Sequence, residues 1–447
     1  MDDTICAIST AINGAISIVR ISGIDSIKIV NKVFSKKIND ESHKIYYGNI
    51  IDNDELIDEV LVMVMRSPKT YTTEDIVEIN CHGGITTTNK VLEILLKNGA
   101  RLAEPGEFTK RAYLNGRINL LEAESVNDLI TAKTDAARKL AINNVDGKLS
   151  KKISDLREKI AKILANIEVN IDYPEYTDEL EVTNDLMHGY LNDIKKDLDN
   201  LVNGAKSGRL IKEGVNVAII GKPNVGKSSI LNSFLDEDKA IVTNIPGTTR
   251  DIVEGTITLD GVAINLIDTA GIRKTDDLVE QIGVEKSSQT ADNSDIILFV
   301  LNNNETITNE EINLLNKYNS EKLILFVNKN DLENKLSVPN NIKDVIYGNT
   351  IDTGGLENLK NKLRNKLNLK NIINKDMSYL SNVREIDLVN KASSSLKSAQ
   401  ENLDAGFPVD VVAIDLKNAW EYLGEIMGMS YKDELVDKIF SNFCLGK

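Results

Sequence analysis

The segment GKPNVGKS at 221–228 is the feature that most restricts how this chain can fold. It follows the apolar run VNVAII at 215–220 and precedes a helical pattern. A Gly-x-x-x-x-Gly-Lys-Ser segment in that position forms a loop whose backbone N–H groups bind phosphates. Lys227 is expected to neutralise β- and γ-phosphate charge, and the Ser228 hydroxyl to bind Mg²⁺. The adjacent residues expected to contact the nucleotide are Asn224, Val225, Gly226 and Ser229.

The chain around this loop alternates strands and helices. The runs IILFVL at 296–301 and KLILFVN at 322–328 are continuously apolar. Apolar strands separated by helices indicate a mostly parallel sheet that is covered on both faces. Nucleotide sites lie at the carboxyl ends of such strands. We therefore predict a separate α/β domain of the P-loop type, inserted at 212–372.

The sequence NKND at 328–331 indicates that the nucleotide is GTP rather than ATP. It closes a strand and would present Asn328, Lys329 and Asp331 to the base. The Asp331 carboxylate can accept two hydrogen bonds from the N1–H and N2–H groups of guanine, which adenine lacks. A buried carboxylate that is left unpaired is costly, so adenine is excluded.

Two further segments are typical of switches whose order depends on the γ-phosphate. In DTAG at 268–271, Asp268 can hold Mg²⁺ through water and the Gly271 N–H can contact the γ-phosphate. In PGTTRD at 246–251, Thr249 offers a second hydroxyl to Mg²⁺. The residues of these segments expected to contact GTP or its metal ion are Thr243, Asn244, Ile245, Pro246, Gly247, Thr248, Thr249, Asp268, Thr269, Ala270 and Gly271.

The residue after DTAG is Ile272, whose aliphatic side chain cannot orient the attacking water as glutamine does in Ras. Another group must take that role. Glu280 is a candidate for positioning the water, and Arg250 or Arg273 for stabilising charge. The pattern alone leaves open whether Glu280 acts in catalysis or is a solvated surface side chain.

Long helices are predicted on both sides of the inserted domain. Apolar residues from Leu149 to Ile167 recur at alternating spacings of four and three, which is the seam of a packed helix. Similar seams occur at 187–201 and 389–403, and a last helical stretch covers about 412–443. Each narrow apolar stripe needs a partner, which favours one all-α bundle formed by 119–211 and 373–447. Unrelated coiled segments are the alternative.

The first 118 residues mix β-rich runs with one clear helix. The runs ISIVRI at 16–21, LVMVM at 61–65 and IVEINC at 76–81 predict strands. The pattern at 85–98 predicts a helix that Gly99 ends. We expect an α/β or α+β domain at 1–118.

Charge and composition limit the class of partner and the compartment. The formal net charge is -15 and the pI is about 4.9, which excludes a nonspecific nucleic-acid coat. An RNA partner must therefore meet a local basic patch. The acidic start MDDTICAIST and the lack of a long apolar run predict a cytoplasmic protein. The spacing of Cys6, Cys81 and Cys444 predicts neither a disulfide framework nor a zinc site, and it leaves a free thiol open at Cys444.

Three further segments carry a family resemblance. They are EDIVEINCHGG at 74–84, PGEFTKRAYLNGR at 105–117 and the terminal FCLGK at 443–447. Together with the nucleotide motifs, they make the chain resemble the MnmE (TrmE) family of tRNA uridine-modifying GTPases over essentially its whole length. The resemblance implies a homodimer joined through the amino-terminal domains, and GTPase domains that approach each other when GTP and K⁺ are bound. It assigns K⁺ to Asn224, Thr243, Ile245 and Thr248, and the water-orienting glutamate to Glu280.

The resemblance also implies a one-carbon cofactor, a partner enzyme and a tRNA substrate. The cofactor is a 5-formyltetrahydrofolate-type folate, and the partner is the FAD- and NADH-using MnmG (GidA), in a heterotetramer that modifies C5 of the wobble uridine. No membrane partner is implied. Family folate contacts correspond to Arg20, Glu78, Arg117 and Lys447, and the suspected functional thiol to Cys444. The residues leave open a purely structural Arg20–Glu78 pair, a free tail at Lys447 and an incidental Cys444.

The sequence departs from the family pattern at three places. STAINGAIS at 9–17 replaces a loop rich in glycine and proline, and Thr73 replaces a usual glycine. Residues 349–351, Asn-Thr-Ile, replace a Ser-Ala-Lys type of loop behind guanine. Two other classes compete with the family assignment. An Era- or Der-like ribosome-assembly switch predicts a basic KH-like carboxyl domain, and a dynamin-like mechanoenzyme needs a basic amphipathic stretch.

Overall fold

The computed structural model describes residues 3–39, 41–172, 184–237, 255–268, 289–318, 321–350, 353–372, 377–429 and 433–446. The chain divides into two compact units. The first comprises Met1–Asn127, Ser150–Leu191 and Ser394–Lys447, and the second comprises Asp128–Leu149 and Asn192–Ser393. Among the helices that the structure describes, none is long and apolar enough to cross a membrane.

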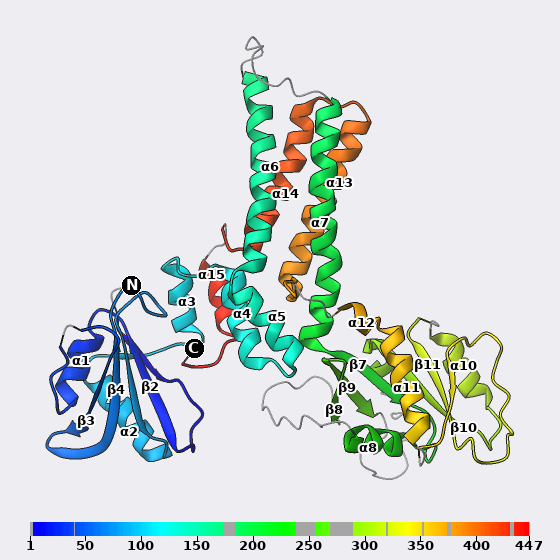
Figure 1. Ribbon diagram of the computed structural model, residues 1–447, viewed down its shortest axis with the longest axis horizontal. Helices are drawn as coiled ribbons and strands as arrows, with labels where there is room; N and C mark the ends of the chain where they lie inside the picture. Colours follow the sequence, from blue (N-terminus) through cyan, green and yellow to red (C-terminus); the bar gives the residue numbers. More distant parts are fainter. Residues whose placement is uncertain are drawn as a thin grey trace. The chain divides into compact units, whose positions relative to one another are not determined.

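The first unit begins with a six-stranded, mostly antiparallel sheet (Figure 1). Its strand order is β3-β4-β5-β2-β1-β6, and only β1 and β6 pair in parallel. The strands are β1 (Ile5–Ile8), β2 (Ile16–Ser22), β3 (Lys44–Asp52), β4 (Glu55–Met65), β5 (Ile76–His82) and β6 (Arg101–Leu102). Helices α1 (Ser26–Val33) and α2 (Ile85–Lys97) pack on one face of this sheet. The predicted strands and the predicted helix at 85–98 are therefore confirmed.

Successive side chains of a strand point to opposite faces of the sheet, and this alternation decides which residues lie on the outer face, away from α1 and α2. Val19 and Ile21 point into the core below α1 and α2, so Arg20 between them lies on the outer face. Near β1 this face is covered by α3 (Glu107–Leu114), whose Phe108 packs on Ile5 of β1. Over β3 and β4 the outer face carries exposed apolar side chains, namely Ile45, Tyr47 and Leu61.

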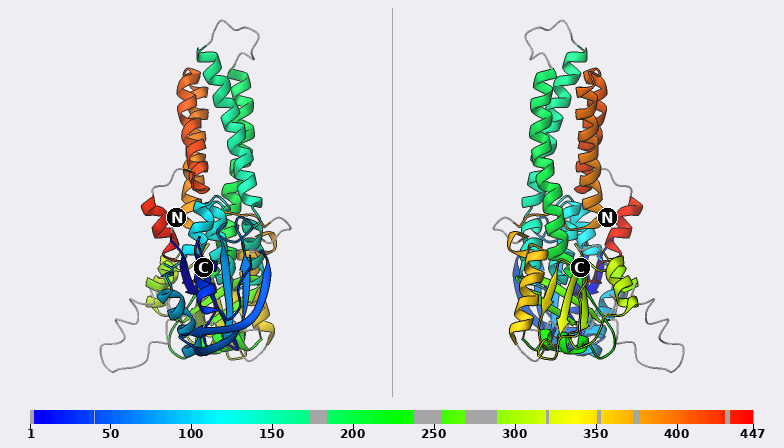
Figure 2. Two further views of the ribbon diagram at one scale, coloured as in Figure 1. Left: turned by 90° about the vertical axis from the view of Figure 1, so that its left-hand side faces the viewer. Right: turned by 90° about the vertical axis from the view of Figure 1, so that its right-hand side faces the viewer.

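The predicted helical seams are buried, and the long helices pair across the two separated segments of the chain (Figure 2). Arg157 of α6 donates to the Trp420 carbonyl oxygen of α14, and Gln400 of α13 hydrogen bonds with His188 of α7. A bundle formed by two discontinuous segments is thereby confirmed. Its helices are α4 (Leu120–Thr131), α6 (Lys148–Asp172), α7 (Asn184–Glu213), α13 (Val383–Asp404), α14 (Val409–Ile426) and α15 (Asp433–Phe440).

One predicted helix is in fact two. The continuous stretch expected at about 412–443 is divided, because α14 ends at Ile426 and Gly428 has a φ of +86°. A Cβ atom there would also lie 2.8 Å from the Tyr113 hydroxyl oxygen, so a close approach of α3 requires glycine at this break. The shorter α15 then packs on α3 through Phe440 and Phe443.

The second unit contains the inserted α/β domain. Its sheet has the order β12-β11-β10-β7-β9-β8, and all pairs are parallel except β8 with β9. The strands are β7 (Val215–Ile220), β8 (Gly255–Leu259), β9 (Val262–Asp268), β10 (Ile296–Asn302), β11 (Leu323–Asn328) and β12 (Val345–Tyr347). Apolar clusters fill both faces of the sheet, as the continuously apolar strands predict. The helices are α5 (Asp135–Val145), α8 (Lys227–Glu237), α10 (Asn309–Lys317), α11 (Thr353–Lys366) and α12 (Leu369–Ile372).

The two connections that lead into and out of the inserted domain lie together in the second unit. A Cβ atom at Gly208 of α7 would be 2.2 Å from the Leu380 carbonyl oxygen. Lys212 near the end of α7 pairs with Asp128 at 2.7 Å and donates to Asn382. Entry and exit thus share one junction, as expected for an insertion. The predicted boundaries at 118, 211 and 372 stay predictions.

Candidate functional site

The phosphate-binding segment forms a tight loop between β7 and α8 in the second unit (Figure 1). Three of its residues have positive φ, namely Gly221 (151°), Asn224 (63°) and Gly226 (102°). A Cβ atom at Gly221 would lie 2.4 Å from the Val300 carbonyl oxygen, and one at Gly226 would lie 2.2 Å from Asn328 Nδ2. Both distances are shorter than real contacts, so only glycine fits at these two positions.

Lys227 is the first residue of α8, and its side chain lies inside the loop. It is buried, and its Nζ donates hydrogen bonds to the carbonyl oxygens of Gly221 and Lys222, both at 2.7 Å. The ammonium group is therefore held beside the backbone N–H groups of the first turn, where a phosphate would bind. Ser228 and Ser229 belong to the same turn, and Ser229 is exposed.

Asn328 at the end of β11 joins three parts of the nucleotide site. Its side chain is buried, and Nδ2 donates to the Val225 carbonyl oxygen at 2.8 Å. Its Oδ1 accepts hydrogen bonds from the backbone N–H groups of Lys329 at 2.9 Å and Thr350 at 3.2 Å. These contacts tie the phosphate loop to the loops that follow β11 and β12. They give Asn328 a positioning role.

The residues predicted to recognise guanine lie beside the hydrogen bonds that Asn328 makes. Lys329 has a φ of 58°, and its Nζ donates to the Asn224 carbonyl oxygen at 3.3 Å, so its stem lies across the phosphate loop. Asp331 is exposed just beyond it. Asn349 and Thr350 follow β12 and are half-buried. The carboxyl ends of β7, β11 and β12 therefore supply the predicted base and phosphate contacts together.

Part of the predicted nucleotide site lies outside the described residues. The backbone of Asp268 ends β9 opposite Ile219 of β7, which brings it near the start of the phosphate loop. Among the described residues, no group of three or more His, Cys, Asp or Glu side chains could hold a metal ion. The predictions outside the described residues are Thr243, Asn244, Ile245, Pro246, Gly247, Thr248, Thr249, Arg250, Thr269, Ala270, Gly271, Ile272, Arg273 and Glu280.

A second group of predicted residues meets on the outer face of the first sheet. Arg20 on β2 and Glu78 on β5 are opposite each other in the register, and Arg20 Nε donates to Glu78 Oε1 at 2.8 Å. The Arg20 guanidinium lies 5.5 Å from the ring centroid of Phe108 and 5.9 Å from that of Tyr71. Arg117 lies 4.8 Å from the Tyr71 centroid and donates to the Tyr71 carbonyl oxygen at 3.1 Å. Two predicted arginines thus contact one aromatic side chain.

The C-terminal segment reaches this group. Gly446 is buried with a φ of +87°, and a Cβ atom there would lie 2.2 Å from the Ile8 carbonyl oxygen of β1. Arg20 Nη1 donates to the Gly446 carbonyl oxygen at 3.5 Å. The Gly106 N–H donates to the Cys444 carbonyl oxygen at 3.2 Å. Residues 444–446 are therefore docked by backbone contacts, while Lys447 lies outside the described residues.

The three cysteines have different environments. Cys6 and Cys81 are buried in the first unit, whereas Cys444 is exposed. Burial raises the pKa of the Cys6 thiol to about 12, and burial also raises that of Cys81. Cys444 is thus the cysteine whose thiol solvent can reach.

A pocket of about 600 Å³ opens beside Tyr71. Its walls come from Pro68–Thr73 on one side and Asn115–Arg117 on the other, with Met65 of β4 below. Thr73 in this wall has a φ of 64°, which β-branched residues rarely adopt. The left-handed backbone explains why the family pattern has glycine at that position.

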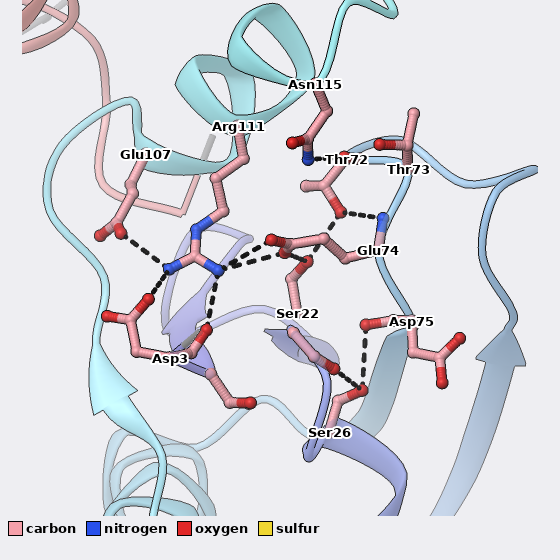
Figure 3. Close-up of polar contacts among 12 residues, drawn as sticks. Asp3, Ser22, Ser26, Thr72, Thr73, Glu74, Asp75, Glu107, Arg111 and Asn115 are labelled. Carbon is pink, nitrogen blue, oxygen red and sulfur yellow. Dashed lines mark hydrogen bonds and ion pairs between the residues drawn. The ribbon is translucent and has the colours of Figure 1, made fainter. Parts of the chain in front are cut away.

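A buried network holds the wall of the pocket in place (Figure 3). The Arg111 side chain is 1% exposed and points between Asp3, Glu107 and Glu74. Its Nη1 donates to both Glu74 carboxylate oxygens at 3.1 Å, and its Nη2 to Asp3 Oδ1 at 2.7 Å and Glu107 Oε1 at 3.1 Å. Ser22 Oγ in turn donates to Glu74 Oε2 at 2.7 Å.

The same network reaches the turn that lines the pocket. The hydroxyls of Ser22 and Thr72 hydrogen bond at 2.7 Å, and Asn115 Nδ2 donates to the Thr72 carbonyl oxygen at 2.7 Å. The Tyr71 hydroxyl hydrogen bonds with Thr109 Oγ1 at 2.9 Å. The positions of Tyr71 and Thr73 are therefore set by side chains from β2, α3 and the residue that follows α3.

Charge in this network shifts two carboxyl groups. Burial alone would raise the pKa of Asp3 and Glu107, but hydrogen bonds from Arg101 and Arg111 and the charge of Arg101 outweigh it. The pKa values of both carboxyl groups are lowered as a result, so both are ionised at neutral pH.

Tyr71 and Arg111 are two residues of this site that sequence reasoning missed. Arg111 lies in PGEFTKRAYLNGR, which carries the family resemblance, and Tyr71 lies two residues before Thr73, where the sequence departs from the family pattern. The signal that could have identified Arg111 is its position in a short helix beside the buried Phe108 and Ala112, with Glu107 one turn before it. A buried arginine needs carboxylate partners. Nothing in its own segment distinguishes Tyr71.

The carboxyl-terminal part of the chain bears on the alternative of a ribosome-assembly switch. That alternative predicts a basic KH-like domain at the end of the chain. The described residues at 377–429 and 433–446 instead form the helices α13, α14 and α15 of the bundle. The KH-like expectation of that alternative is therefore not met.

Two family models together match nearly the whole chain. The model described as "MnmE helical domain" matches residues 120–444, and the model described as "GTP-binding protein TrmE N-terminus" matches residues 4–117.

Full-length relatives agree with these matches. A tRNA modification GTPase MnmE from Streptococcus thermophilus (strain CNRZ 1066) is 49% identical, covering 100% of this chain and 98% of the relative. One from Enterococcus faecalis (strain ATCC 700802 / V583) is also 49% identical with the same coverage. The crystal structure of an Aquifex aeolicus Era variant with GDP and AlF4⁻ is 23% identical, covering 40% of this chain and 66% of that chain, with a TM-score of 0.26. At that TM-score, the similarity adds nothing to the assignment.

Proposed function

Because this chain belongs to the MnmE family of tRNA modification GTPases, we propose that it hydrolyses GTP while modifying C5 of the wobble uridine of tRNAs. The observation that carries the GTPase half is the loop at 221–228, which curls around the buried Lys227 ammonium. The carboxyl end of β11, with Asn328 and Asp331, meets that loop, which supports guanine as the base. GTP hydrolysis by the purified protein, with ATP as the control nucleotide, tests this half.

The loop performs positioning and charge neutralisation in this mechanism. Its backbone N–H groups and Lys227 bind the β- and γ-phosphates, and the Ser228 hydroxyl together with Thr249 holds Mg²⁺. Glu280 orients the attacking water. The residues proposed to complete the site are those of the switch segments named from the sequence.

We assign K⁺ to Asn224, Thr243, Ile245 and Thr248. A cation there stabilises charge that develops on the phosphates, as an arginine does in other GTPases. Asn224 supports this assignment, because it lies in the phosphate loop and its side-chain amide offers an oxygen atom of the kind that binds K⁺. Hydrolysis in KCl should be much faster than in NaCl. Equal rates would remove the K⁺ assignment and return Arg250 or Arg273 as the charge stabiliser.

A tetrahydrofolate derivative of the 5-formyl type is proposed to bind on the outer face of the first sheet. The donor set supports this, since Glu78 can accept hydrogen bonds from ring N–H groups, and Arg117 can bind a glutamyl carboxylate. Arg20 and Lys447, which follows the docked residues 444–446, complete the proposed set. When bound, the folate supplies a one-carbon unit. Calorimetric titration with 5-formyltetrahydrofolate tests the site, and Glu78→Gln should weaken binding.

The partners follow from the proposed reaction. FAD and NADH chemistry requires the MnmG (GidA) partner, which we propose joins the chain as a heterotetramer, with tRNA as the substrate in the cytoplasm. A homodimer is supported by Ile45, Tyr47 and Leu61, which are exposed on the uncovered part of the outer sheet face. Tyr47→Asp should produce monomers in light scattering if a second copy covers this face.

Cys444 connects the two halves of the proposal. Its thiol is exposed, its carbonyl oxygen accepts a hydrogen bond from the Gly106 N–H, and Gly446 two residues later contacts Arg20 of the proposed folate site. We propose that nucleotide-driven rearrangement of the bundle repositions residues 444–447 during the one-carbon chemistry. Deletion of these four residues should abolish tRNA modification and spare GTP hydrolysis. Loss of both activities would contradict the coupling.

A further inference from the structure

The charges around Tyr71 are distributed unevenly. Arg20 contacts the Tyr71 ring but does not line the pocket, and it is paired with the Glu78 carboxylate at 2.8 Å. Arg117 lines the pocket, donates to a backbone carbonyl oxygen and lies over the ring, and no carboxylate pairs with it among the described residues. Lys69 is exposed in the same pocket, and within the described part of the chain it too has no carboxylate partner. The uncompensated positive charge therefore lies on the pocket side of Tyr71.

The lining of the pocket strengthens this difference. Its residues include two cations, Lys69 and Arg117, and no aspartate or glutamate. The remaining polar groups come from Thr70, Thr73 and Asn115, which donate hydrogen bonds as readily as they accept them. The formal net charge of the whole chain is -15, so the positive lining of this pocket has the opposite sign to the charge of the chain as a whole. Such a lining suits a ligand that carries several negative groups.

The size of the pocket exceeds what one carboxylate needs. Its volume is about 600 Å³ and it is open to solvent, so it has room for several carboxylates of a chain that stays partly exposed. Its walls are fixed in advance, since Asn115 is bonded to Thr72 and Tyr71 to Thr109. A preformed cationic pocket can therefore accept a chain of anionic groups that extends beyond Arg117.

We propose that this pocket binds the glutamyl end of the folate, and that Lys69 makes the site selective for polyglutamylated folates. The inference rests on the proposed folate function and adds an orientation to it. The ring system lies on the Glu78 side of Tyr71, and the α-carboxylate of the first glutamate binds Arg117. Each further glutamate adds one carboxylate, and Lys69 binds those that follow.

The size of the effect follows from the exposure of Lys69. A solvent-exposed lysine interacting with mobile carboxylates is worth little for one pair and is screened by salt. We therefore expect the wild type to bind a pentaglutamate about 3-fold to 10-fold more tightly than a monoglutamate at low salt. Raising the KCl concentration should narrow that ratio, because the interaction is between exposed charges.

Calorimetric titrations of the full-length protein with 5-formyltetrahydrofolate mono- and pentaglutamate test the proposal. Lys69→Gln should bring the two affinities together by lowering the pentaglutamate affinity more than the monoglutamate affinity, and Lys69→Arg should restore the preference. Lys28→Gln is the matched control. It removes the same charge from α1, where the side chain is 73% exposed, on the face of the sheet away from Arg20. It should keep the preference.

The outcomes that would overturn the inference can be told apart. Equal affinities in the wild type would reject polyglutamate selectivity and leave folate binding itself intact. A preference that persists in Lys69→Gln would reject the role of Lys69, and weaker tRNA binding by the same variant would then assign the cationic pocket to RNA phosphates. Failure of both ligands to bind the wild type would reject the proposed folate function as a whole.

Discussion

The nucleotide loop of the second unit and the pocket of the first differ in how their residues are brought together. The loop takes nearly all its groups from eight consecutive residues, 221–228, and adds one tie through Asn328. The pocket and the adjoining Arg20–Glu78 ion pair combine residues near 20, 71, 78 and 117 with the last residues of the chain. A contiguous motif sets its own backbone geometry, whereas a dispersed site depends on the packing of the whole unit.

The difference extends to how each site holds its cations. Lys227 donates to two backbone carbonyl oxygens of the phosphate loop, and these bonds place its ammonium group where a phosphate would bind. Arg111 is surrounded by three carboxylates, and its charge serves the fold. A buried cation can thus act in ligand binding or in structure, and its partners decide which.

Removal of Lys227 should have the largest effect of the changes considered. It should impair the nucleotide site and leave the folate site unaffected. Lys227→Ala is expected to slow GTP hydrolysis about 100-fold or more, because it removes a preorganised charge at the phosphates. Folate affinity should stay at the wild-type value. Hydrolysis rates and calorimetric folate titrations measure the two effects.

Lys222→Ala is the matched control for this change. Lys222 lies in the same loop, but its Nζ pairs with Glu311 at 3.0 Å and is not enclosed by the loop. Its loss should affect hydrolysis far less. A similar loss in both variants would mean that removal of either positive charge has the same effect, contrary to the specific role assigned to Lys227.

Removal of Arg111 should impair the pocket of the first unit by lowering the stability of that unit. Arg111→Met is expected to destabilise the first unit by about 3–5 kcal/mol, since it leaves the Glu74 carboxylate without its cation. Arg101→Met is the control. Arg101 pairs with the same Asp3 and Glu107 but is 45% exposed, so about 1 kcal/mol or less is expected. Urea unfolding monitored in the first unit measures both.

Acid titration provides a second test of the same network. The folded-state pKa values of Asp3 and Glu107 are lowered from 3.8 and 4.5, respectively. Such groups stabilise the fold above their unfolded pKa values, and that stability is lost as pH falls through the lowered folded values. Wild-type stability should therefore fall as the pH drops below about 4.5. A dependence just as steep in Arg101→Met and in Arg111→Met would exclude the two arginines as the source of the lowered pKa values.

A substitution in the docked C-terminal segment should have a smaller effect that is confined to the first unit. Gly446→Ala should release residues 444–447, because its Cβ atom would lie 2.2 Å from the Ile8 carbonyl oxygen. Carboxypeptidase should then remove these residues faster, and folate affinity should fall, while GTP hydrolysis is unchanged. Gly406→Ala is the control, since Gly406 has a φ of +74° with nothing within 4 Å of its Cβ position. Equal release in both variants would point to backbone strain rather than to docking.

Thr73→Gly should have the smallest effect and the opposite sign. Relief of the left-handed backbone at Thr73 favours the variant by about 1–2 kcal/mol, and the greater freedom of glycine in the unfolded chain offsets about half of this. A small net stabilisation of the first unit is expected. Asn53→Gly is the control, because Asn53 has a φ of 49° that asparagine tolerates. Thermal unfolding compares the two, and a loss of stability in Thr73→Gly would show that the Thr73 side chain contributes contacts.

The sequence predicted local features well because their causes are local. The strand, loop and helix at 215–237 follow from apolar runs and from glycines that the loop requires. By contrast, the division of the last helical stretch at Gly428 depends on a close approach of Tyr113, which no local pattern encodes.

The dispersed site could be predicted only in part. The family motifs pointed to Arg20, Glu78 and Arg117. The structure pairs Glu78 with Arg20 and brings the two arginines to Tyr71. The aromatic side chain that they share was not predictable, because its contacts join strands and helices far apart in the sequence. The burial of Arg111 depends on the same long-range packing.

Mass spectrometry of tRNA nucleosides tests most directly whether both sites serve one reaction. A strain that lacks this protein would be complemented with the wild type, with Lys227→Ala or with Glu78→Gln. The account predicts that the wild type restores the C5-modified wobble uridine and that neither variant does, although Glu78→Gln still hydrolyses GTP. Full modification in the strain that carries Lys227→Ala would contradict it.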